Sequence, residues 1–568
     1  MRRKGTVVIP CRGLAILIAV FVGNATGSLG QAIDSGKNLL AADAGSSANQ
    51  AVHQTDPTPQ NGNELILQEL ERMRARIEQL ETELKQRDAA ERPTTVVRTA
   101  EASPPASLPL TAAEMARPTV QGEPLPATTQ PEKKQKAEPF AFGDFTWLNG
   151  NARTKTPAFD SKFFTPEIRS DVDYIVDFNH PVDDTIGGSS EVFRADEFQV
   201  TQLGVGGDFH YDNVRARLMT QFGMYSFTTP RNDASPARGQ WDLDTAYRYI
   251  SEGYGGYHIN ALHGINIDAG IFMSYIGLFS YYNFDNWAYQ PSYVSSNTPW
   301  FFNGMRVQVF PTEHLKIEPW LINGWQSYGR FNHRPGFGAQ ILYRPTSSVS
   351  VLGNQYFLGA DDLGIPNRIR YHTDNSLEVK YYDHPDNLLD KMAFSLTGDA
   401  GCEHGGGVSC DTNSVQIVNG QRVVAPKQSF LGYMAYNRLW FHRDLFGFTV
   451  GGGKINNPGR YLVLLPPING ATAVSGTPYF PENPGDPYKA WDSSATFDYM
   501  PSQYITFRWE YDHREANVPY FTGRGGITPP GGNTGAPGSI VILPNGSTWY
   551  PDLRRDENRL DLAILVKF

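Results

Sequence analysis

From about residue 140 to the C-terminus, apolar and polar residues alternate in short runs, and this pattern constrains the fold most strongly. In Gln503–Arg514 (QYITFRWEYDHR), one face carries Ile505, Phe507, Trp509 and Tyr511, and the other carries Thr506, Arg508, Glu510 and Asp512. Successive side chains of a strand point to opposite faces. In a soluble sandwich the apolar faces would meet in a core. In a barrel in lipid they point outward and the polar faces line the lumen.

The last ten residues favour the barrel. Arg559–Phe568 (RLDLAILVKF) alternates in the same way and ends on an aromatic residue. It resembles the terminal strand by which outer-membrane barrels are recognised for insertion, so barrel-insertion machinery and outer-membrane lipid are expected partners. The alternative is a soluble sheet strand that ends at Phe by chance. The residues expected to carry the insertion signal are Ile564, Val566 and Phe568.

The connections between these runs indicate the size of the barrel. Arg344–Ser347, Met500–Ser502 and Phe310–His314 are short turns, whereas Asn456–Lys489 and Asn517–Thr548 are long and rich in Gly, Pro and Asn. Short turns at one end and long loops at the other are typical of outer-membrane barrels. The predicted fold is all-β, a transmembrane antiparallel barrel of about 16 strands (roughly 14–18). A barrel of this size keeps an aqueous lumen.

Composition excludes several other classes of protein. The 568 residues have a mean hydropathy of -0.40 and one apolar run, whereas a helical transporter needs repeated apolar spans. A formal net charge of -10 argues against a nucleic-acid partner. There is no G-x-S-x-G, H-E-x-x-H or phosphate-loop motif. We therefore expect neither an enzyme nor a cofactor, and no metal site.

The N-terminal region predicts export and a tether. Residues 1–32 combine basic residues, the apolar run LAILIAVFV at 14–22 and small residues, which is typical of a signal peptide cleaved after Ala32. This predicts the outer membrane of a Gram-negative-type envelope. Residues 33–62 are polar and predicted to be disordered, and residues 91–139 form a Pro-rich periplasmic linker ahead of the barrel at 140–568.

Residues 63–90 contain an a/d heptad seam and are predicted to form a coiled coil. The stretch Arg76–Glu81 resembles the trimer-favouring signature, so a homotrimer is expected, with a dimer or a lone amphipathic helix as alternatives. A periplasmic coiled coil could hold the trimer together or contact the cell wall. The residues assigned to it are Ile66, Leu70, Met73, Arg76, Ile77, Leu80, Glu81 and Leu84.

Charged residues on the polar faces of the strands are candidates for lining a pore. Lining charges and pore width set the selectivity of a channel. Both signs occur, which predicts weak ion selectivity, and the alternative for each residue is a rim or turn charge. The candidates are Arg215, Arg217, Asp268, Lys316, Glu318, Glu378, Lys380, Arg508, Glu510 and Asp512.

Residues Phe279–Phe302 are a candidate constriction loop, rich in aromatic residues and with Asp285 as its only charge. Aromatic rows in a pore can stack sugars, but an interfacial girdle with ordinary loop packing is the favoured interpretation. The loop residues singled out are Tyr282, Asp285, Trp287 and Tyr289.

Cys402 and Cys410 lie eight positions apart in GCEHGGGVSC. In an exported chain they are expected to form a disulfide. A metal site with His404 is the alternative, and it lacks a fourth ligand.

Several passages resemble the OmpL-like beta-barrel porin family. They are Gly304–Val309, His314–Trp325, Gly270–Pro291, Gly338–Pro345 and Thr496–Glu510. The resemblance covers roughly residues 140–568 and implies an outer-membrane channel. Together with the strand pattern it predicts a porin for passive diffusion of small hydrophilic solutes and ions. A structural envelope barrel or adhesin that acts through its long loops is the alternative.

Overall fold

The computed structural model describes residues 138–568 except 182–183, 185, 188, 190–191, 231–232, 234, 236–240, 331, 333, 361–366, 412–413, 419, 458–487, 518–519, 525–540, 543–547 and 550–552. The predicted signal peptide, disordered segment and coiled coil therefore lie outside the described residues, as does the linker up to residue 137.

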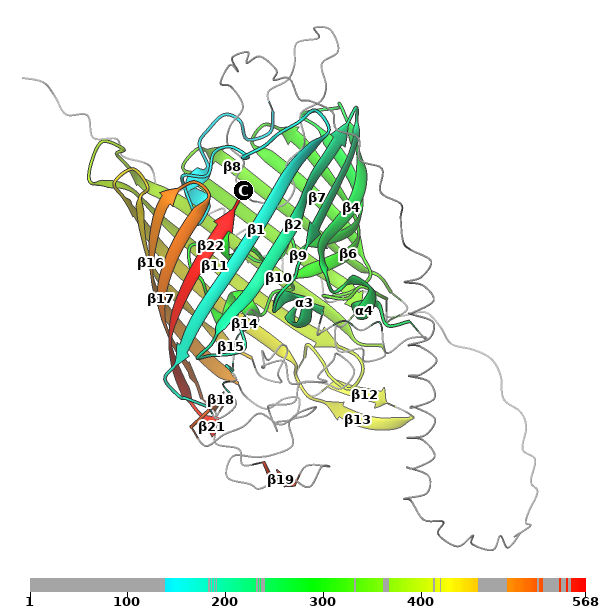
Figure 1. Ribbon diagram of the computed structural model, residues 1–568. Coiled ribbons are helices and arrows are strands. Elements are labelled where there is room, and N and C mark those ends of the chain that lie inside the picture. The colour runs from blue at the N-terminus through cyan, green and yellow to red at the C-terminus, as the bar shows by residue number, and fades with distance from the viewer. Residues whose placement is uncertain are drawn as a thin grey trace, which may run out of the picture. The chain divides into compact units, whose positions relative to one another are not determined.

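Sixteen antiparallel strands form a closed barrel (Figure 1), which confirms the predicted fold class. Each strand pairs with its neighbour along the chain, and β1 pairs with β22 to close the ring. The strands are β1 (Phe164–Asp177), β2 (Phe198–Tyr211), β3 (Val214–Thr220), β4 (Ile250–Ile259), β5 (Ile265–Met273), β6 (Phe301–Thr312), β7 (Leu315–Ile322), β8 (Gly336–Thr346), β9 (Val349–Ala360), β10 (Ile369–Asp383), β11 (Leu389–His404), β14 (Ser429–Phe441), β15 (Phe446–Asn456), β16 (Lys489–Ser502), β17 (Ile505–Ala516) and β22 (Asp556–Lys567).

The residues that alternate in the sequence lie on opposite faces of the barrel wall, with the apolar residues outside and the polar residues inside. On β17, Trp509 and Tyr511 are 42% and 46% exposed on the outer face, whereas Arg508 and Glu510 are buried inside. Exposed apolar residues on the outside of a barrel are what lipid requires, and charged residues inside are what a lumen allows. No helix in the described part of the chain is both long and apolar enough to span a membrane.

The short turns lie at one end of the barrel, which we call the turn end, and the longer connections lie at the other, the loop end. Three predicted turns are displaced, because strands β6, β8 and β16 run on through Pro311, Pro345 and Pro501. The register shifts at each of these prolines. Proline lacks the N–H that a ladder needs, so the strand bulges there and continues to the turn.

The connections at the loop end contain small elements of their own. They include α3 (Tyr225–Thr228), α4 (Leu243–Tyr247) and three two-stranded sheets. The sheets pair β12 (Ser414–Val418) with β13 (Gln421–Ala425), β18 (Phe521–Thr522) with β21 (Leu553–Arg554), and β19 (Val541–Ile542) with β20 (Thr548–Trp549).

The wall begins later than the predicted boundary at residue 140. Residues 140–163 precede β1 and include the 3₁₀ turn η1 (Thr146–Leu148). In Figure 1 this cyan segment lies at the turn end, where β22 finishes. Phe145 and Trp147 are each 1% exposed. The first part of the segment therefore packs inside the barrel instead of forming a strand of it, whereas Phe159 and Phe163, nearer β1, are 72% and 53% exposed.

Candidate channel constriction

Residues 274–300, which join β5 to β6, cross the lumen. We call them the crossing loop; they contain η4 (Asn283–Asp285) and α5 (Tyr293–Ser296). The loop starts from the fifth and sixth strands of the ring, yet α5 packs against β14, β15 and β16, and η4 packs against β22. In the ring of sixteen strands, β14–β16 lie opposite β5 and β6, and β22 lies five positions from β5. The candidate constriction loop of the sequence analysis is therefore brought inside the barrel.

Two charged residues of β17 hold the loop by its backbone. The carboxylate of Glu510 accepts the N–H groups of Tyr289 at 2.6 Å and Gln290 at 2.5 Å. The guanidinium of Arg508 is paired with Asp498 and donates to three backbone carbonyls of the loop. Those carbonyls belong to Asn286 at 2.7 Å and to Asn283 and Ala288 at 3.1 Å. Hydrogen bonds to charged groups are the stronger kind, so the loop is firmly fixed to β17.

The hydroxyl of Tyr289 extends this attachment to β1. It donates to Asp173 at 2.8 Å and to Asp171 at 2.9 Å. Burial, and next the negative charges of Asp171 and Asp173, raise the pKa of Tyr289 well above its ordinary value. The phenol therefore keeps its proton, and this single O–H is the donor that the two carboxylates share.

Further contacts continue the attachment along the same wall. Asp492 on β16 accepts the side chain of Ser292 at 2.8 Å and the N–H of Tyr293 at 3.0 Å. Arg514 on β17 donates to the carbonyl of Pro291 at 2.8 Å. The crossing loop is thus attached to the part of the barrel wall that runs from β14 through β15, β16, β17 and β22 to β1. We call this part of the wall the clamp wall.

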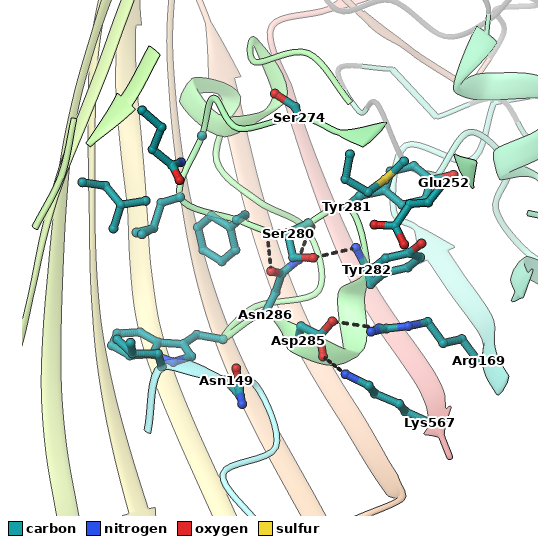
Figure 2. Close-up of a pocket in the computed structure, with 18 of the residues that line it drawn as sticks. Asn149, Arg169, Glu252, Ser274, Ser280, Tyr281, Tyr282, Asp285, Asn286 and Lys567 are labelled. Atoms are coloured by element: carbon teal, nitrogen blue, oxygen red, sulfur yellow. Dashed lines mark hydrogen bonds and ion pairs between the residues drawn. The ribbon is translucent and has the colours of Figure 1, made fainter. Parts of the chain in front are cut away.

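Asp285 fixes the loop where the barrel closes. Its carboxylate lies 2.7 Å from Nη1 of Arg169 on β1 and 3.3 Å from Nζ of Lys567 on β22 (Figure 2). Arg169 also stacks over the ring of Tyr282, 3.9 Å from its centroid. The sole charge of the loop is thus paired with two cations from the two strands that close the ring.

A cavity remains beside the crossing loop and is bordered by residues of β1–β6, β8–β11 and β22. Two of the ten predicted pore-lining residues, Arg217 and Glu378, border it, as do Tyr282, Asp285 and Trp287 of the loop. Both signs of charge are present. The basic residues at its edge are Arg169, Arg217, Arg306 and Lys567, and the acidic ones are Glu167, Asp208, Glu252, Asp285 and Glu378.

Arg217 lies at the edge of this cavity and is paired with three acidic residues. It lies 2.9 Å from Glu167 and 3.0 Å from Asp208, and it is also paired with Glu252. The side chain of Arg217 is 11% exposed. Three carboxylates therefore surround one guanidinium at the open part of the lumen.

The other predicted pore-lining residues are on the inner face but away from the cavity. Arg215, Asp268, Lys316 and Glu318 form buried ion pairs in the wall of β3–β7, such as Lys316 with Glu318 at 2.5 Å. Lys380 pairs with Asp383 near the turn end. On β17, Arg508 and Glu510 lie under the crossing loop, and Asp512 is buried beside them. Most of the predicted residues thus hold structure together and do not face open lumen.

Several residues at the cavity were missed by the sequence analysis. Glu167 and Arg169 alternate with apolar residues on β1, and Lys567 occupies the inner face of β22. The period-2 pattern that identified Arg215 and Arg217 was therefore also present here. Asp208 and Glu252 lie among glycines on β2 and β4, where the pattern is weaker.

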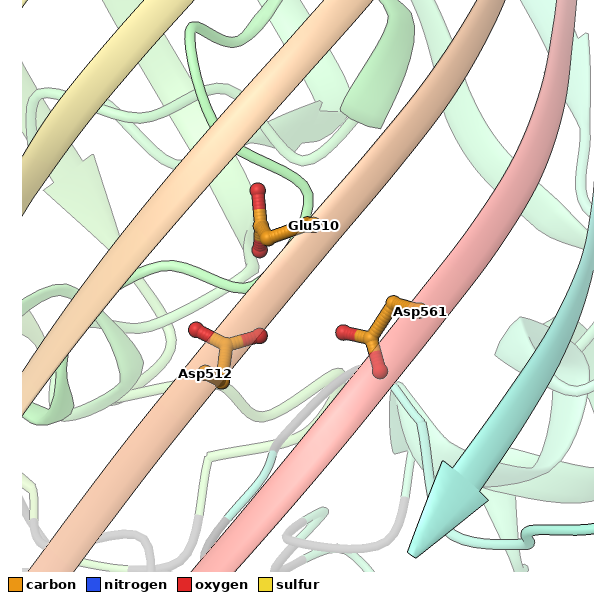
Figure 3. Close-up of side chains that lie close together, drawn as sticks. All are labelled: Glu510, Asp512 and Asp561. Carbon is orange, nitrogen blue, oxygen red and sulfur yellow. The ribbon is translucent and has the colours of Figure 1, made fainter.

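Three carboxylates gather on the clamp wall (Figure 3). Glu510 and Asp512 come from β17 and Asp561 comes from β22, and each offers an oxygen within 4.8 Å of the others. Glu510 already accepts two backbone N–H groups of the loop and the hydroxyl of Thr496. Glu510 therefore takes part in the attachment of the loop to the wall, with Asp512 and Asp561 buried next to it.

At the loop end, Cys402 of β11 and Cys410 are joined by a disulfide, with Cα atoms 5.2 Å apart. The hairpin β12–β13 follows in the same connection. Gln416 of this hairpin donates to the carbonyl of Val408 at 2.6 Å. The disulfide and this contact together brace the base of the connection.

A closed sixteen-stranded barrel with an apolar outer face and a charged lumen crossed by a loop is the architecture of outer-membrane porins. The family described as "Putative beta-barrel porin-2, OmpL-like" matches residues 171–541, more than half of the chain. The chain therefore belongs to this family of outer-membrane porins, as the resemblance in its sequence predicted.

No curated protein matches the chain. Among solved structures it is similar to the outer membrane channel DcaP of Acinetobacter baumannii, with 13% identity, TM-score 0.39, and coverage of 73% of this chain and 100% of that one. It is also similar to an anion-selective porin from Comamonas acidovorans, with 9% identity and a TM-score of 0.39, over 71% of this chain and 99% of that one. The trimer form of OmpT from Vibrio cholerae has 8% identity, TM-score 0.39, and coverage of 72% and 100%.

Proposed function

We propose that the protein is a porin for passive diffusion of small hydrophilic solutes and ions, without enzymatic activity. The cavity beside the crossing loop carries this proposal, because the loop narrows the lumen and leaves a polar space next to it. Basic and acidic residues share the edge of that space, which supports weak ion selectivity.

The turn end is proposed to face the periplasm. Short turns lie on the periplasmic side of bacterial barrels and longer loops on the outside. With this orientation the chain that precedes the barrel lies in the periplasm. After removal of a signal peptide at 1–32, that chain would consist of a disordered segment at 33–62, a coiled coil at 63–90 and a linker at 91–139. The coiled coil could contact the cell wall there.

A homotrimer is part of the same proposal and rests on the heptad seam of residues 63–90. Chemical cross-linking of the detergent-solubilised chain is expected to yield trimers, and deletion of residues 63–90 is expected to weaken them. Dimers as the largest cross-linked species would contradict it.

The alternative function is a structural envelope barrel or adhesin. The hairpin β12–β13 at the loop end favours it, because Ile417 and Val424 are 66% and 61% exposed there. Such a protein would act through its loops and would need no open lumen.

Planar-bilayer recordings of the full-length chain separate the two functions. A porin is expected to give discrete open-channel steps with a reversal potential close to zero in a salt gradient. Liposome swelling with sugars of increasing size would then measure the width. Correctly folded protein that remains electrically silent would favour the structural alternative, and a strongly selective reversal potential would contradict weak selectivity.

A further inference from the structure

A second segment crosses the lumen next to the crossing loop, and it comes from the N-terminal side of the barrel. We call residues 145–151 the mouth segment. At its start, the ring of Phe145 lies 4.4 Å from the guanidinium carbon of Arg344 on β8. The indole N–H of Trp147 donates to the carbonyl of Ser347, in the turn between β8 and β9, at 3.0 Å. The beginning of the segment is therefore fixed to β8 and β9.

The end of the mouth segment is fixed to a distant part of the ring. The amide of Asn151 donates to the carbonyl of Ser502 at 3.0 Å and to the hydroxyl of Thr506 at 3.1 Å. Ser502 ends β16 and Thr506 lies at the start of β17, six or more strands from β8. The mouth segment therefore spans the turn end of the lumen.

Between its two ends the mouth segment touches the crossing loop directly. The N–H of Gly150 donates to the carbonyl of Asp285 at 2.8 Å. The indole of Trp287 donates to the carbonyl of Trp147 at 3.2 Å. Arg438 on β14 joins both segments, because it donates to the carbonyl of Gly150 at 2.7 Å and to that of Trp287 at 3.1 Å.

These contacts involve the same part of the loop that borders the cavity. Asp285 and Trp287 both line it, and so do Leu148 and Asn149 of the mouth segment. Figure 2 shows Asn149 below Asn286 and Asp285, facing the same space. A shift of the mouth segment would therefore move residues that border the cavity on two sides.

We propose that the mouth segment is a second constriction element, which positions the crossing loop and thereby sets the width of the pore. This inference rests on the channel function proposed above. It assigns Trp147 and Gly150 as positioning residues. It also makes the pore sensitive to the chain that enters the barrel at this point, because that chain continues directly into the segment.

Gly150 offers a sharp test, because the segment and the loop meet there without space for a side chain. A Cβ at this position would lie far inside contact distance of the backbone carbonyl oxygens of Phe284 and Asn286. The loop is bonded to the clamp wall at many points, whereas the mouth segment is held to the barrel by fewer hydrogen bonds, which involve Trp147, Gly150 and Asn151. In Gly150→Ala the segment is therefore expected to give way and leave the mouth wider.

The experiment compares single-channel conductance of the full-length wild type, Gly150→Ala and the matched control Gly398→Ala. Gly398 lies on β11, where an added Cβ meets nothing within 4 Å. Conductance of Gly150→Ala is expected to rise by about twofold, because pore width sets ion flow, and that of Gly398→Ala to stay at the wild-type value. Folding of each variant is checked by its heat-modifiable migration in gels.

A second variant keeps the test decisive if Gly150→Ala does not fold. Trp147→Ala removes bulk and creates no clash, and it is expected to raise conductance in the same direction. Wild-type conductance in a folded variant of either residue would overturn the inference. A silent wild type would instead reject the proposed channel function, so the two failures are distinguishable.

Discussion

The clamp wall and the wall around Arg217 carry the same kinds of residue in the same alternating pattern, yet these residues do different things. On β17, Arg508 and Glu510 are each 1% exposed and bind the backbone of the crossing loop. On β3, Arg217 borders the cavity among three carboxylates. The role of an inward charge is therefore decided by where the loop lands and not by the strand that bears it.

The difference has a physical basis in hydration. A charge that is taken out of water needs a partner and additional hydrogen bonds, and removing one partner is costly. A charge at a water-filled cavity keeps part of its hydration, so its removal changes mainly the electric field that a passing ion meets. Substitutions on the clamp wall should thus change stability, and substitutions around Arg217 should change selectivity.

The largest effect is expected for Arg508→Met. The variant removes the donor to three loop carbonyls, although Asp498 keeps an ion pair with Arg438 at 2.7 Å. The free energy of unfolding should fall by about 3 kcal/mol, the lower end of the cost of breaking a buried ion pair. Urea unfolding in detergent, followed by tryptophan fluorescence, measures the loss.

Lys380→Met is the matched control for this prediction. Lys380 is also an inward-facing cation, but its partner Asp383 is 46% exposed. Its removal should cost less than about 1 kcal/mol, as for other exposed ion pairs. Equal losses in the two variants would contradict the conclusion that Arg508 stabilises the barrel through its buried contacts with the crossing loop.

An intermediate effect is expected around Arg217. Arg217→Gln leaves Glu167, Asp208 and Glu252 without their shared cation. The ratio of cation to anion permeability should rise about threefold, because lining charges set selectivity. Glu252→Gln should move the ratio the other way. Reversal potentials in a potassium chloride gradient measure both, and shifts of the same sign would show that these side chains do not face the ion path.

The sequence was sufficient for the barrel and for the faces of its strands, because both follow from local alternation. Arg508 and Arg217 both belong to the polar set of residues in the alternating runs of β17 and β3, and both lie on the inner side of the wall. What alternation cannot encode is the landing place of the crossing loop, since this depends on contacts such as Asp285 with Arg169 and Lys567, which are distant in sequence. The same reason applies to residues 145–151, whose place inside the barrel depends on contacts such as that of Trp147 with Ser347.

The smallest change in conductance is expected when the disulfide is removed, because the disulfide lies apart from both walls. The double variant Cys402→Ser, Cys410→Ser lacks the crosslink at the base of the β12–β13 connection. A short closed loop of this kind contributes about 2–3 kcal/mol to local stability, so limited proteolysis should cut residues 405–428 faster than in the wild type. Conductance and the barrel unfolding midpoint should stay unchanged, because neither cysteine touches the crossing loop or borders the cavity. A change in conductance would show that the loop end is coupled to the constriction, and it would extend the comparison of the two walls to a third region.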